Sequence, residues 1–254
     1  MARYLSKNSS AKQQLLEIIS SLVRDDRAAR QAGQAVDNRL PSESELSHRI
    51  GLSVSTIREA LRTLEMEGYI SKKHGMGNYY HASTLESRMR IDTIMDFSDL
   101  LADAGLQVTV SQSDLMSIPK DYPAGTPFER QLSASLGSLM RYDRMYLADG
   151  RTAIATRNYI PASSIDTREG TVTPRENLID FLWFNCSKQV THSIELMTPE
   201  IADEAERRLF ELPENTPLIR WSETFYSYDD EAVGYAEVAF NPTLIGMRLL
   251  RKWS

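Results

Sequence analysis

The stretch from Leu40 to His81 constrains the fold of this chain more than any other part of it. Ser42 and Glu45 have the spacing of a capping box, in which each side chain satisfies one free backbone N–H at the start of a helix. Gly51 can adopt the positive φ at which many helices end. A short helix is therefore expected between Ser42 and Gly51.

A second helix is expected to begin at Ser53, because a serine side chain can accept a hydrogen bond from the first helical turn. Apolar residues then recur on one helical face at Ile57, Leu61 and Leu64. Gly68 ends this pattern. Two helices joined by a short turn that contains glycine are typical of a helix-turn-helix motif, whose second helix lies in the major groove of DNA.

A hairpin is expected next, because β-prone runs at 69–73 and 78–81 flank a glycine-rich tetrad at 74–77. A hairpin in this position is the wing of a winged helix. An amphipathic helix pair with a solvated arginine face would fit the two helices alone, but the hairpin favours DNA binding. The residues placed to reach bases or phosphates are Ser55, Thr56, Arg58, Arg62, Lys73 and His74.

The distribution of charge indicates two domains. The formal net charge of the chain is −6, but residues 1–82 hold 12 basic and 9 acidic residues, and the remainder holds 17 and 26. The first part is therefore net +3 and the second net −9, so the basic excess lies where DNA is expected to bind. Apolar residues from Leu15 to Val23 predict a helix that packs on the pair. The polar run 24–38 is expected to extend this helix before looping back, as a solvated surface element.

The second part of the chain is expected to form an α+β domain on an antiparallel sheet. The Asp149–Gly150 pair is a strong hairpin signal. One helix is expected over 177–184, and another opens at Thr198, because proline at residue 199 suits the first helical turn. The expected strands are 107–118, 139–146, 151–160, 190–196, 218–228 and 231–240.

Four motifs in the first part resemble the DNA-binding domain of GntR-family bacterial transcription regulators: LPSESEL, GLSVSTIREAL, LEMEGYI and HGMGN. The resemblance implies DNA contacts from the start of the second helix and from the wing. Members often carry arginine where this chain has Ser44 and Val54, so its operator is expected to differ from the common site. Pattern and resemblance together give the DNA-binding set Ser42, Ser53, Ser55, Thr56, Arg58, Arg62, Lys73, His74 and Gly75.

The second part resembles the UTRA effector domain of the HutC-like GntR subgroup, through RMYLADG at Arg144, NYIP at Asn158 and the segments around Asn177, Ala202 and Tyr235. This implies a DNA-binding domain over 1–82, a linker over 83–88 and an effector-binding and dimerisation domain over 89–254. The fold expected is thus a winged helix-turn-helix domain joined to an antiparallel-sheet α+β domain of the UTRA/chorismate-lyase-like type.

The UTRA resemblance also implies a small-molecule pocket that controls DNA binding. Arg144 suits a carboxylate or phosphate, because a guanidinium binds either one bidentately. Asn177 at a helix start would add N–H donors. Members that bind sugar phosphates often differ at Tyr146, Thr156 and Asn177, which argues against that class of effector. The candidate ligand contacts are Ser98, Arg144, Tyr146, Thr156, Asn177 and Glu237.

The expected function is that of a homodimeric repressor that binds a double-stranded DNA operator and responds to a small-molecule, possibly anionic, effector. The alternatives are an enzyme with a chorismate-lyase-like domain and a GntR regulator with an all-helical, metal-dependent effector domain. No zinc spacing, nucleotide loop or nucleophile elbow is apparent, so no catalytic residue, metal or cofactor is expected. The single Cys186, expected to be a buried apolar residue, and the lack of a membrane-spanning apolar run suit the bacterial cytoplasm, at the nucleoid when bound to DNA.

Overall fold

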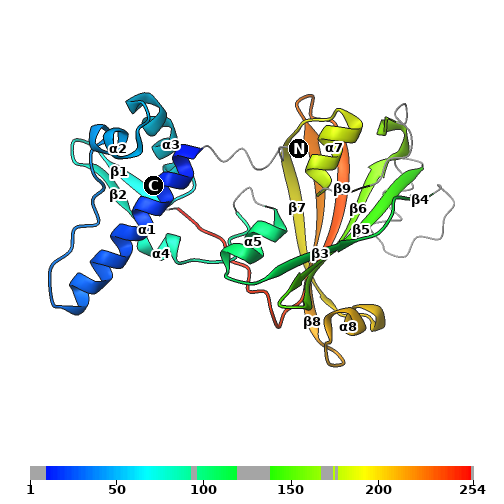
Figure 1. Ribbon diagram of the computed structural model, residues 1–254. Helices are drawn as coiled ribbons and strands as arrows, with labels where there is room; N and C mark the ends of the chain where they lie inside the picture. The colour runs from blue at the N-terminus through cyan, green and yellow to red at the C-terminus, as the bar shows by residue number, and fades with distance from the viewer. Residues whose placement is uncertain (1–9, 93–95, 119–137, 167–173, 175–176, 253–254) are drawn as a thin grey trace. The chain divides into compact units, whose positions relative to one another are not determined.

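The computed structural model describes residues 10–92, 96–118, 138–166, 174 and 177–252 (Figure 1). By its internal contacts the chain divides into two units. Of the described residues, 10–92 and 247–252 form the winged-helix unit, and the rest form the sheet unit. None of the helices in these ranges combines the length and the apolar character needed to cross a membrane.

The winged-helix unit is built around α1 (Ser10–Gln31). Its buried stripe, Leu15, Ile19 and Val23, packs on the helix pair that follows. The polar residues after Val23 continue the same helix to Gln31 and are mostly exposed. The run 24–38 therefore extends the first helix to Gln31 and is mostly solvated, as predicted.

The predicted helix-turn-helix is confirmed by α2 (Glu43–Ile50) and α3 (Val54–Met66). Ser42 and Glu45 form the expected capping box at the start of α2, and Gly51 ends it with φ of 77°. Ser53 caps α3 by accepting a hydrogen bond from the Thr56 N–H over 3.2 Å. The inward faces of the pair bury Leu46, Ile57, Ala60, Leu61 and Leu64 in one core with α1.

The predicted wing is also present, as the antiparallel strands β1 (Ile70–Lys73) and β2 (Gly77–Tyr80). The Met76 N–H donates to the Lys73 carbonyl over 3.0 Å and closes the turn between them. A short helix, α4 (Ala82–Leu85), follows β2. This order of elements is that of a winged helix.

The sheet unit holds a seven-stranded antiparallel sheet in the order β3-β5-β6-β9-β8-β7, with β4 also paired to β5. The Asp149–Gly150 turn joins β5 to β6, with φ of 50° and 82°, as the hairpin signal predicted. The strands are β3 (Val108–Gln112), β4 (Met116–Ile118), β5 (Leu139–Ala148), β6 (Arg151–Pro161), β7 (Val190–Ile201), β8 (Pro217–Ser227) and β9 (Ala232–Phe240).

The register assigns residues to the two faces of this sheet, because side chains directly opposite each other point the same way. Arg144 lies opposite Thr156, Thr156 opposite Val238, and Val238 opposite Trp221. We call the face with these four side chains the covered face, and the other the opposite face.

Two helices pack on the covered face (Figure 1). Phe97 of α5 (Phe97–Asp103) contacts the rings of Tyr146, Trp221 and Phe240, with centroids 5.4–5.8 Å apart. α7 (Leu178–Cys186) approaches so closely that a Cβ on Gly234 would lie 2.7 Å from Leu182. On the opposite face, α8 (Glu204–Phe210) buries Phe210 against β8 and β9, and the 3-10 helix η1 (Ala162–Ser164) follows β6.

Two sequence-based expectations for this unit are wrong. Residues 198–201 extend β7 instead of opening a helix, because Thr198 to Ile201 pair with β8 at a sheet edge, where proline is tolerated. The helix begins later, after Asp203, which forms a capping box with Glu206. The segment 107–118 is two strands rather than one, interrupted at residues 113–115.

Candidate DNA-binding surface and effector site

The exposed face of α3 carries the side chains expected to reach DNA bases. Ser55, Thr56, Arg58 and Arg62 are all exposed, while Ile57 on the reverse side is fully buried. The buried stripe therefore fixes the rotation of α3 so that its polar side points outward. This is the orientation a recognition helix needs in order to enter the major groove.

Two of the predicted DNA contacts also have a structural task. The Ser42 backbone N–H and the Ser42 hydroxyl both donate to the Glu45 carboxylate over 2.8 Å, and these two hydrogen bonds lower the pKa of Glu45. The Ser53 hydroxyl lies 2.8 Å from the hydroxyls of both Ser55 and Thr56. Both serines cap helices, and helix N-termini also favour phosphate oxygens.

Arg58 is held by an acidic neighbour on α2. Its Nε and Nη2 donate to the same oxygen of Glu43 over 3.0 and 2.8 Å, while 64% of the arginine side chain remains exposed. Ion pairs of this exposed kind contribute at most about 1 kcal/mol. Arg58 on α3 is thus held by Glu43 on α2 in a weak, exposed ion pair, and its contact with a base stays a prediction.

The wing places the remaining predicted contacts at its tip. Lys73, His74 and Gly75 are exposed, and the Lys73 ammonium lies 4.5 Å from the centre of the Tyr79 ring. An ammonium over an aromatic ring keeps its charge while its position is restricted. The tip therefore presents positive charge where a wing meets phosphate.

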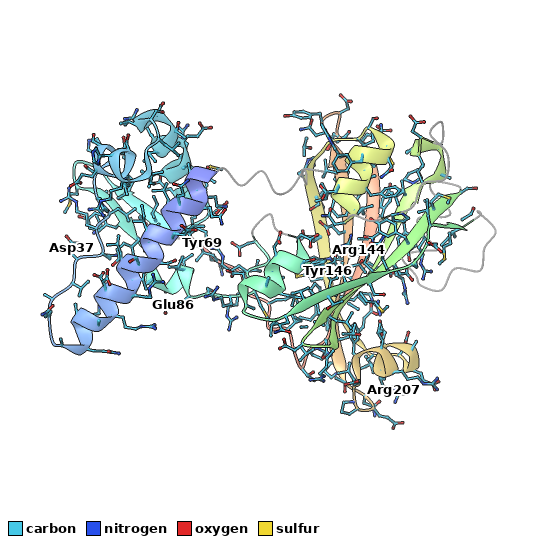
Figure 2. All side chains as sticks on the ribbon, in the orientation of Figure 1. Asp37, Tyr69, Glu86, Arg144, Tyr146 and Arg207 are labelled. Atoms are coloured by element: carbon cyan, nitrogen blue, oxygen red, sulfur yellow. The ribbon has the colours of Figure 1, made fainter. Side chains whose placement is uncertain are left out.

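The predicted ligand residue Arg144 lies on the covered face in β5, the second strand from one edge of the sheet, beside Tyr146 (Figure 2). Arg144 is 7% exposed, and its Nε and Nη1 have no hydrogen-bond partner among the described residues. Its guanidinium carbon lies 5.2 Å from the centre of the Tyr146 ring. A buried guanidinium with unused donors is costly, because buried charges are normally paired. An anion at this place would supply the missing acceptors.

Thr156 lies beside this arginine, and Asn177 lies at the start of α7, which packs on the same face. Thr156 is the direct neighbour of Arg144 across β5 and β6 and accepts a hydrogen bond from Asn158 over 3.0 Å. Asn177 caps α7 through the Asp180 N–H over 3.0 Å. The side-chain amide of Gln112, the β3 neighbour of Arg144, donates a hydrogen bond to the carbonyl of Pro174, which lies three residues before Asn177.

Ser98 lies in the first turn of α5, the other helix on the covered face. Its backbone N–H donates to the Asp96 carboxylate over 2.7 Å, and its side chain is half-buried. The structure therefore places Arg144, Tyr146 and Thr156 together on the covered face, with Asn177 and Ser98 on the two helices that pack there.

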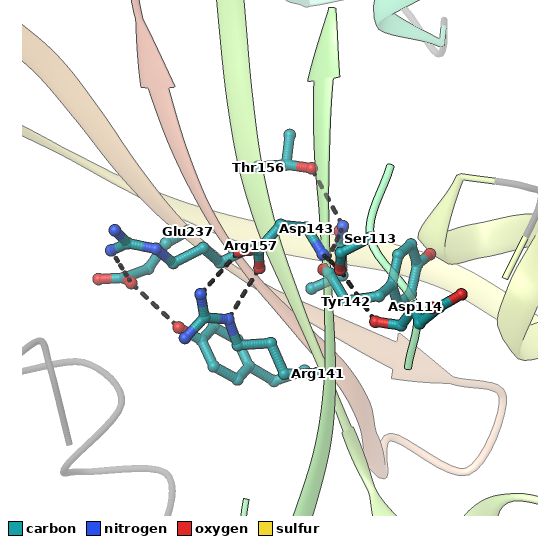
Figure 3. A network of polar contacts seen from close by, with 10 residues as sticks. Ser113, Asp114, Arg141, Tyr142, Asp143, Thr156, Arg157 and Glu237 are labelled. Atoms are coloured by element: carbon teal, nitrogen blue, oxygen red, sulfur yellow. Dashed lines mark hydrogen bonds and ion pairs between the residues drawn. The ribbon is translucent and has the colours of Figure 1, made fainter. Parts of the chain in front are cut away.

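Glu237 is not part of this group. The register pairs it with Arg157 and Ser222, one position away from Val238, so its side chain points to the opposite face. There it is 3% exposed, lies 3.6 Å from the Arg157 guanidinium and accepts a hydrogen bond from Tyr159 over 3.3 Å (Figure 3). The body of the sheet separates its carboxylate from Arg144, so the two predicted ligand residues do not share a face, and the role of Glu237 stays a prediction.

Sequence reasoning missed two polar groups of the covered face. Trp221 is 4% exposed, and its Nε1–H has no acceptor among the described residues. Glu223 lies directly opposite Glu195, and burial together with that second carboxylate raises its pKa to about 8. The sequence contains a signal for both groups. Trp221, Glu223 and Phe225 occupy alternate positions of one predicted strand, so Glu223 shares a sheet face with two aromatic residues, where an apolar residue is expected.

Neither metal nor thiol chemistry is suggested by the described residues. No three histidine, cysteine, aspartate or glutamate side chains gather there as metal ligands would. Cys186 is buried in α7, and burial raises the pKa of its thiol to about 12. The thiol is therefore protonated and behaves as a small apolar group, as expected.

Comparisons with known proteins agree with both units. Residues 30–79 match the family model described as bacterial regulatory proteins, gntR family, and residues 123–244 match the model of the UTRA domain. The fold is similar to that of PhnF from Mycobacterium smegmatis, at 16% identity, a TM-score of 0.54 and coverage of 91% of this chain and 100% of that one. It is also similar to YydK from Bacillus subtilis, described as a possible transcriptional regulator, at 15% identity, a TM-score of 0.62 and coverage of 93% and 99%.

A winged helix joined to a UTRA domain defines a DNA-binding transcription regulator with an effector domain. The chain belongs to the GntR family, and its architecture is consistent with the HutC-like subgroup.

Proposed function

We propose that this regulator is a homodimeric repressor that releases its operator when a small anionic metabolite binds the covered face of its sheet unit. Two winged-helix units would read two half-sites about one turn of DNA apart. The effector would shift the protein between two states by binding one of them more tightly. The main support for effector binding is the guanidinium of Arg144, which is buried and has donors without a partner among the described residues.

The surroundings of Arg144 support an anionic group attached to an apolar or planar body. Arg144 and Trp221 stand in the same row across the sheet, separated by the small side chains of Thr156 and Val238. Both have buried N–H groups for which the described part of the chain offers no acceptor. Phe97 touches the rings of Tyr146 and Trp221 at the same place. Carboxylate or phosphate oxygens would satisfy the donors while the rings cover the remainder of the ligand.

The free edge of the sheet supports a dimer. Among the described residues, β7 pairs with β8 alone, so the other edge of β7 is unpaired. Its side chains Ile194, Leu196 and Ile201 are 60%, 65% and 60% exposed. A long edge strand with exposed apolar residues tends to pair with another chain. A second copy of this chain would cover it with the same surface, as two-fold symmetry requires.

The experiment that tests the function uses the full chain. Operators are selected from random duplexes, and fluorescence anisotropy then compares the Kd for the selected operator with that for a scrambled duplex. A metabolite screen by thermal shift identifies effectors, because a ligand that binds the folded state raises the melting temperature. An effector is expected to weaken operator binding. Binding the operator no better than the scrambled duplex, with every metabolite mixture, would refute the proposal.

Arg144→Gln tests the role of the covered face, and Arg141→Gln is its matched control. Arg141 lies on the same strand but on the opposite face, where it is already paired with Asp143 over 2.8 and 2.6 Å (Figure 3). Arg144→Gln is expected to abolish the effector-induced rise in melting temperature and leave operator affinity in place. Arg141→Gln should preserve both. An undiminished effector response in Arg144→Gln would show that the ligand binds elsewhere.

A further inference from the structure

The end of the chain returns to the DNA-binding half. Of the described residues, 247–252 belong to the winged-helix unit, although residues 96–246 belong to the sheet unit. From residue 10 onward the chain therefore passes between the units twice, once between residues 92 and 96 and again at Gly246–Met247. We call residues 88–92 the outgoing segment and residues 247–252 the return segment.

The outgoing and return segments are hydrogen-bonded to each other. Arg90 and Arg248 form a parallel β-bridge, in which the Arg248 N–H donates to the Met89 carbonyl and the Ile91 N–H donates to the Arg248 carbonyl, both over 3.0 Å. Met89 has φ of 56°, an uncommon conformation for a residue with a side chain, and one that persists only where the surroundings enforce it. The outgoing and return segments are thus joined by two backbone hydrogen bonds, and we call the pair of segments the strap.

The return segment reaches the C-terminal end of the recognition helix α3. The Lys252 ammonium donates to the Glu65 carbonyl in the last turn of that helix. Leu250 packs against Gly68, where an added Cβ would lie 2.1 Å from its Cδ2 atom. The last carbonyls of a helix lack partners within the helix and favour a positive charge. The return segment supplies such a charge, together with an apolar contact.

The outgoing segment reaches the same end of α3. Arg90, which is 5% exposed, donates from Nη2 to the Glu67 carbonyl over 2.9 Å. Asp92 holds this guanidinium through hydrogen bonds of 3.2 and 2.5 Å and also accepts from the Leu250 N–H over 3.4 Å. Asp92 therefore joins the two segments, and both of them hold carbonyls where α3 ends.

We infer that the return segment positions the recognition helix, with Leu250 and Lys252 as the positioning residues. Both segments hold the C-terminal end of α3, and each is joined through the chain to the sheet unit. The inference rests on the proposed function, because positioning matters only for a protein that reads an operator. The inference adds that residues 247–252 contribute to operator recognition.

The test compares Leu250→Ala with Leu249→Ala in the full chain. Leu249 is 64% exposed, whereas Leu250 contacts Gly68, so the pair separates the contact from the loss of a leucine. Leu250→Ala is expected to reduce the ratio of operator to scrambled-duplex affinity about tenfold, while affinity for the scrambled duplex stays unchanged. Leu249→Ala should retain the ratio of the unaltered protein. A domain that had merely lost stability would lose affinity for both duplexes.

Hydrogen exchange gives a second readout that needs no DNA. Leu250→Ala is expected to speed exchange at Gly68 and Tyr69, whose N–H groups donate to Glu65 and Leu64, and at Ile91 in the strap. Lys252→Ala changes an exposed side chain and removes its hydrogen bond to the Glu65 carbonyl, so it tests the same inference if Leu250→Ala does not fold. Lys252→Arg, which keeps the positive charge, should show normal exchange. Unchanged exchange at these amides overturns the inference even if no operator exists. Faster exchange with an unchanged affinity ratio also overturns it.

Discussion

Glu223 provides a test of the chemistry of the covered face that does not require knowledge of the effector. Its side chain is 9% exposed and lies directly across from Glu195, so burial and the neighbouring negative charge both favour the protonated form. The pKa of Glu223 is raised to about 8, against about 4.3 for a glutamate in an unfolded chain. Between these two values the folded protein keeps a proton that the unfolded chain has lost.

The sign of the pH dependence follows from this difference. The stability contributed by the protonated carboxyl is fully present below the unfolded pKa and is lost as pH rises through the folded pKa of about 8. Each pH unit in this window lowers the free energy of unfolding by at most about 1.4 kcal/mol, which makes a few kcal/mol across the window. Glu223→Gln has the same shape and cannot titrate, so it removes this loss.

The assay is urea unfolding of the sheet unit within the full chain, followed by the fluorescence of its tryptophans, Trp183 and Trp221. Relative to the unaltered protein, Glu223→Gln is expected to gain stability steadily from pH 5 to pH 8. Glu195→Gln should reproduce part of the gain, because it removes the like charge. Glu214→Gln, at a side chain 82% exposed, is the control without effect. A stability difference that stays constant from pH 5 to pH 8 would refute the argument.

The remaining predictions concern the recognition surface and one buried asparagine. Arg58→Ala should lose about 1–3 kcal/mol of discrimination between operator and altered bases, measured by anisotropy with substituted operators. Lys73→Ala should weaken all duplexes alike and reduce the salt dependence of log Kd by about one. Asn241, fully buried, donates to the carbonyls of Thr152 and Phe210 over 2.9 and 3.0 Å. Asn241→Ala should therefore lower the free energy of unfolding by about 1–3 kcal/mol in the same urea assay, because it leaves buried carbonyls unpaired.

Local signals predicted the winged helix almost completely. The capping box at Ser42, the cap at Ser53 and the ending at Gly51 each depend on neighbours within a few residues, so the sequence alone contains them. The same holds for the Asp149–Gly150 turn. Proline at residue 199 is the counter-example: it suits a helix start and a sheet edge equally, and pairing with a distant strand decided between them.

Non-local pairing is also the reason why part of the candidate site could not be predicted from the sequence. Glu237 and Val238 differ by one position, yet the register with β6 sends their side chains to opposite faces of the sheet. No pattern within β9 distinguishes the two, because almost every residue of that strand is buried. The return of residues 247–252 to α3 depends on contacts with residues more than 150 positions earlier in the chain, which short-range periodicity does not report.

The Arg58–Glu43 pair has a consequence for how the protein searches a genome. The recognition helix does not offer a bare guanidinium to every duplex it meets, because a carboxylate already occupies it at 2.8 Å. In the proposed role of Arg58, a correct base would have to displace Glu43, whereas a wrong base would leave the ion pair in place. Selectivity is a difference between two affinities, so an internal competitor lowers the attraction of chance sequences. In this proposal, Glu43 on α2 would set the minimum interaction energy that a base must offer before Arg58 binds it.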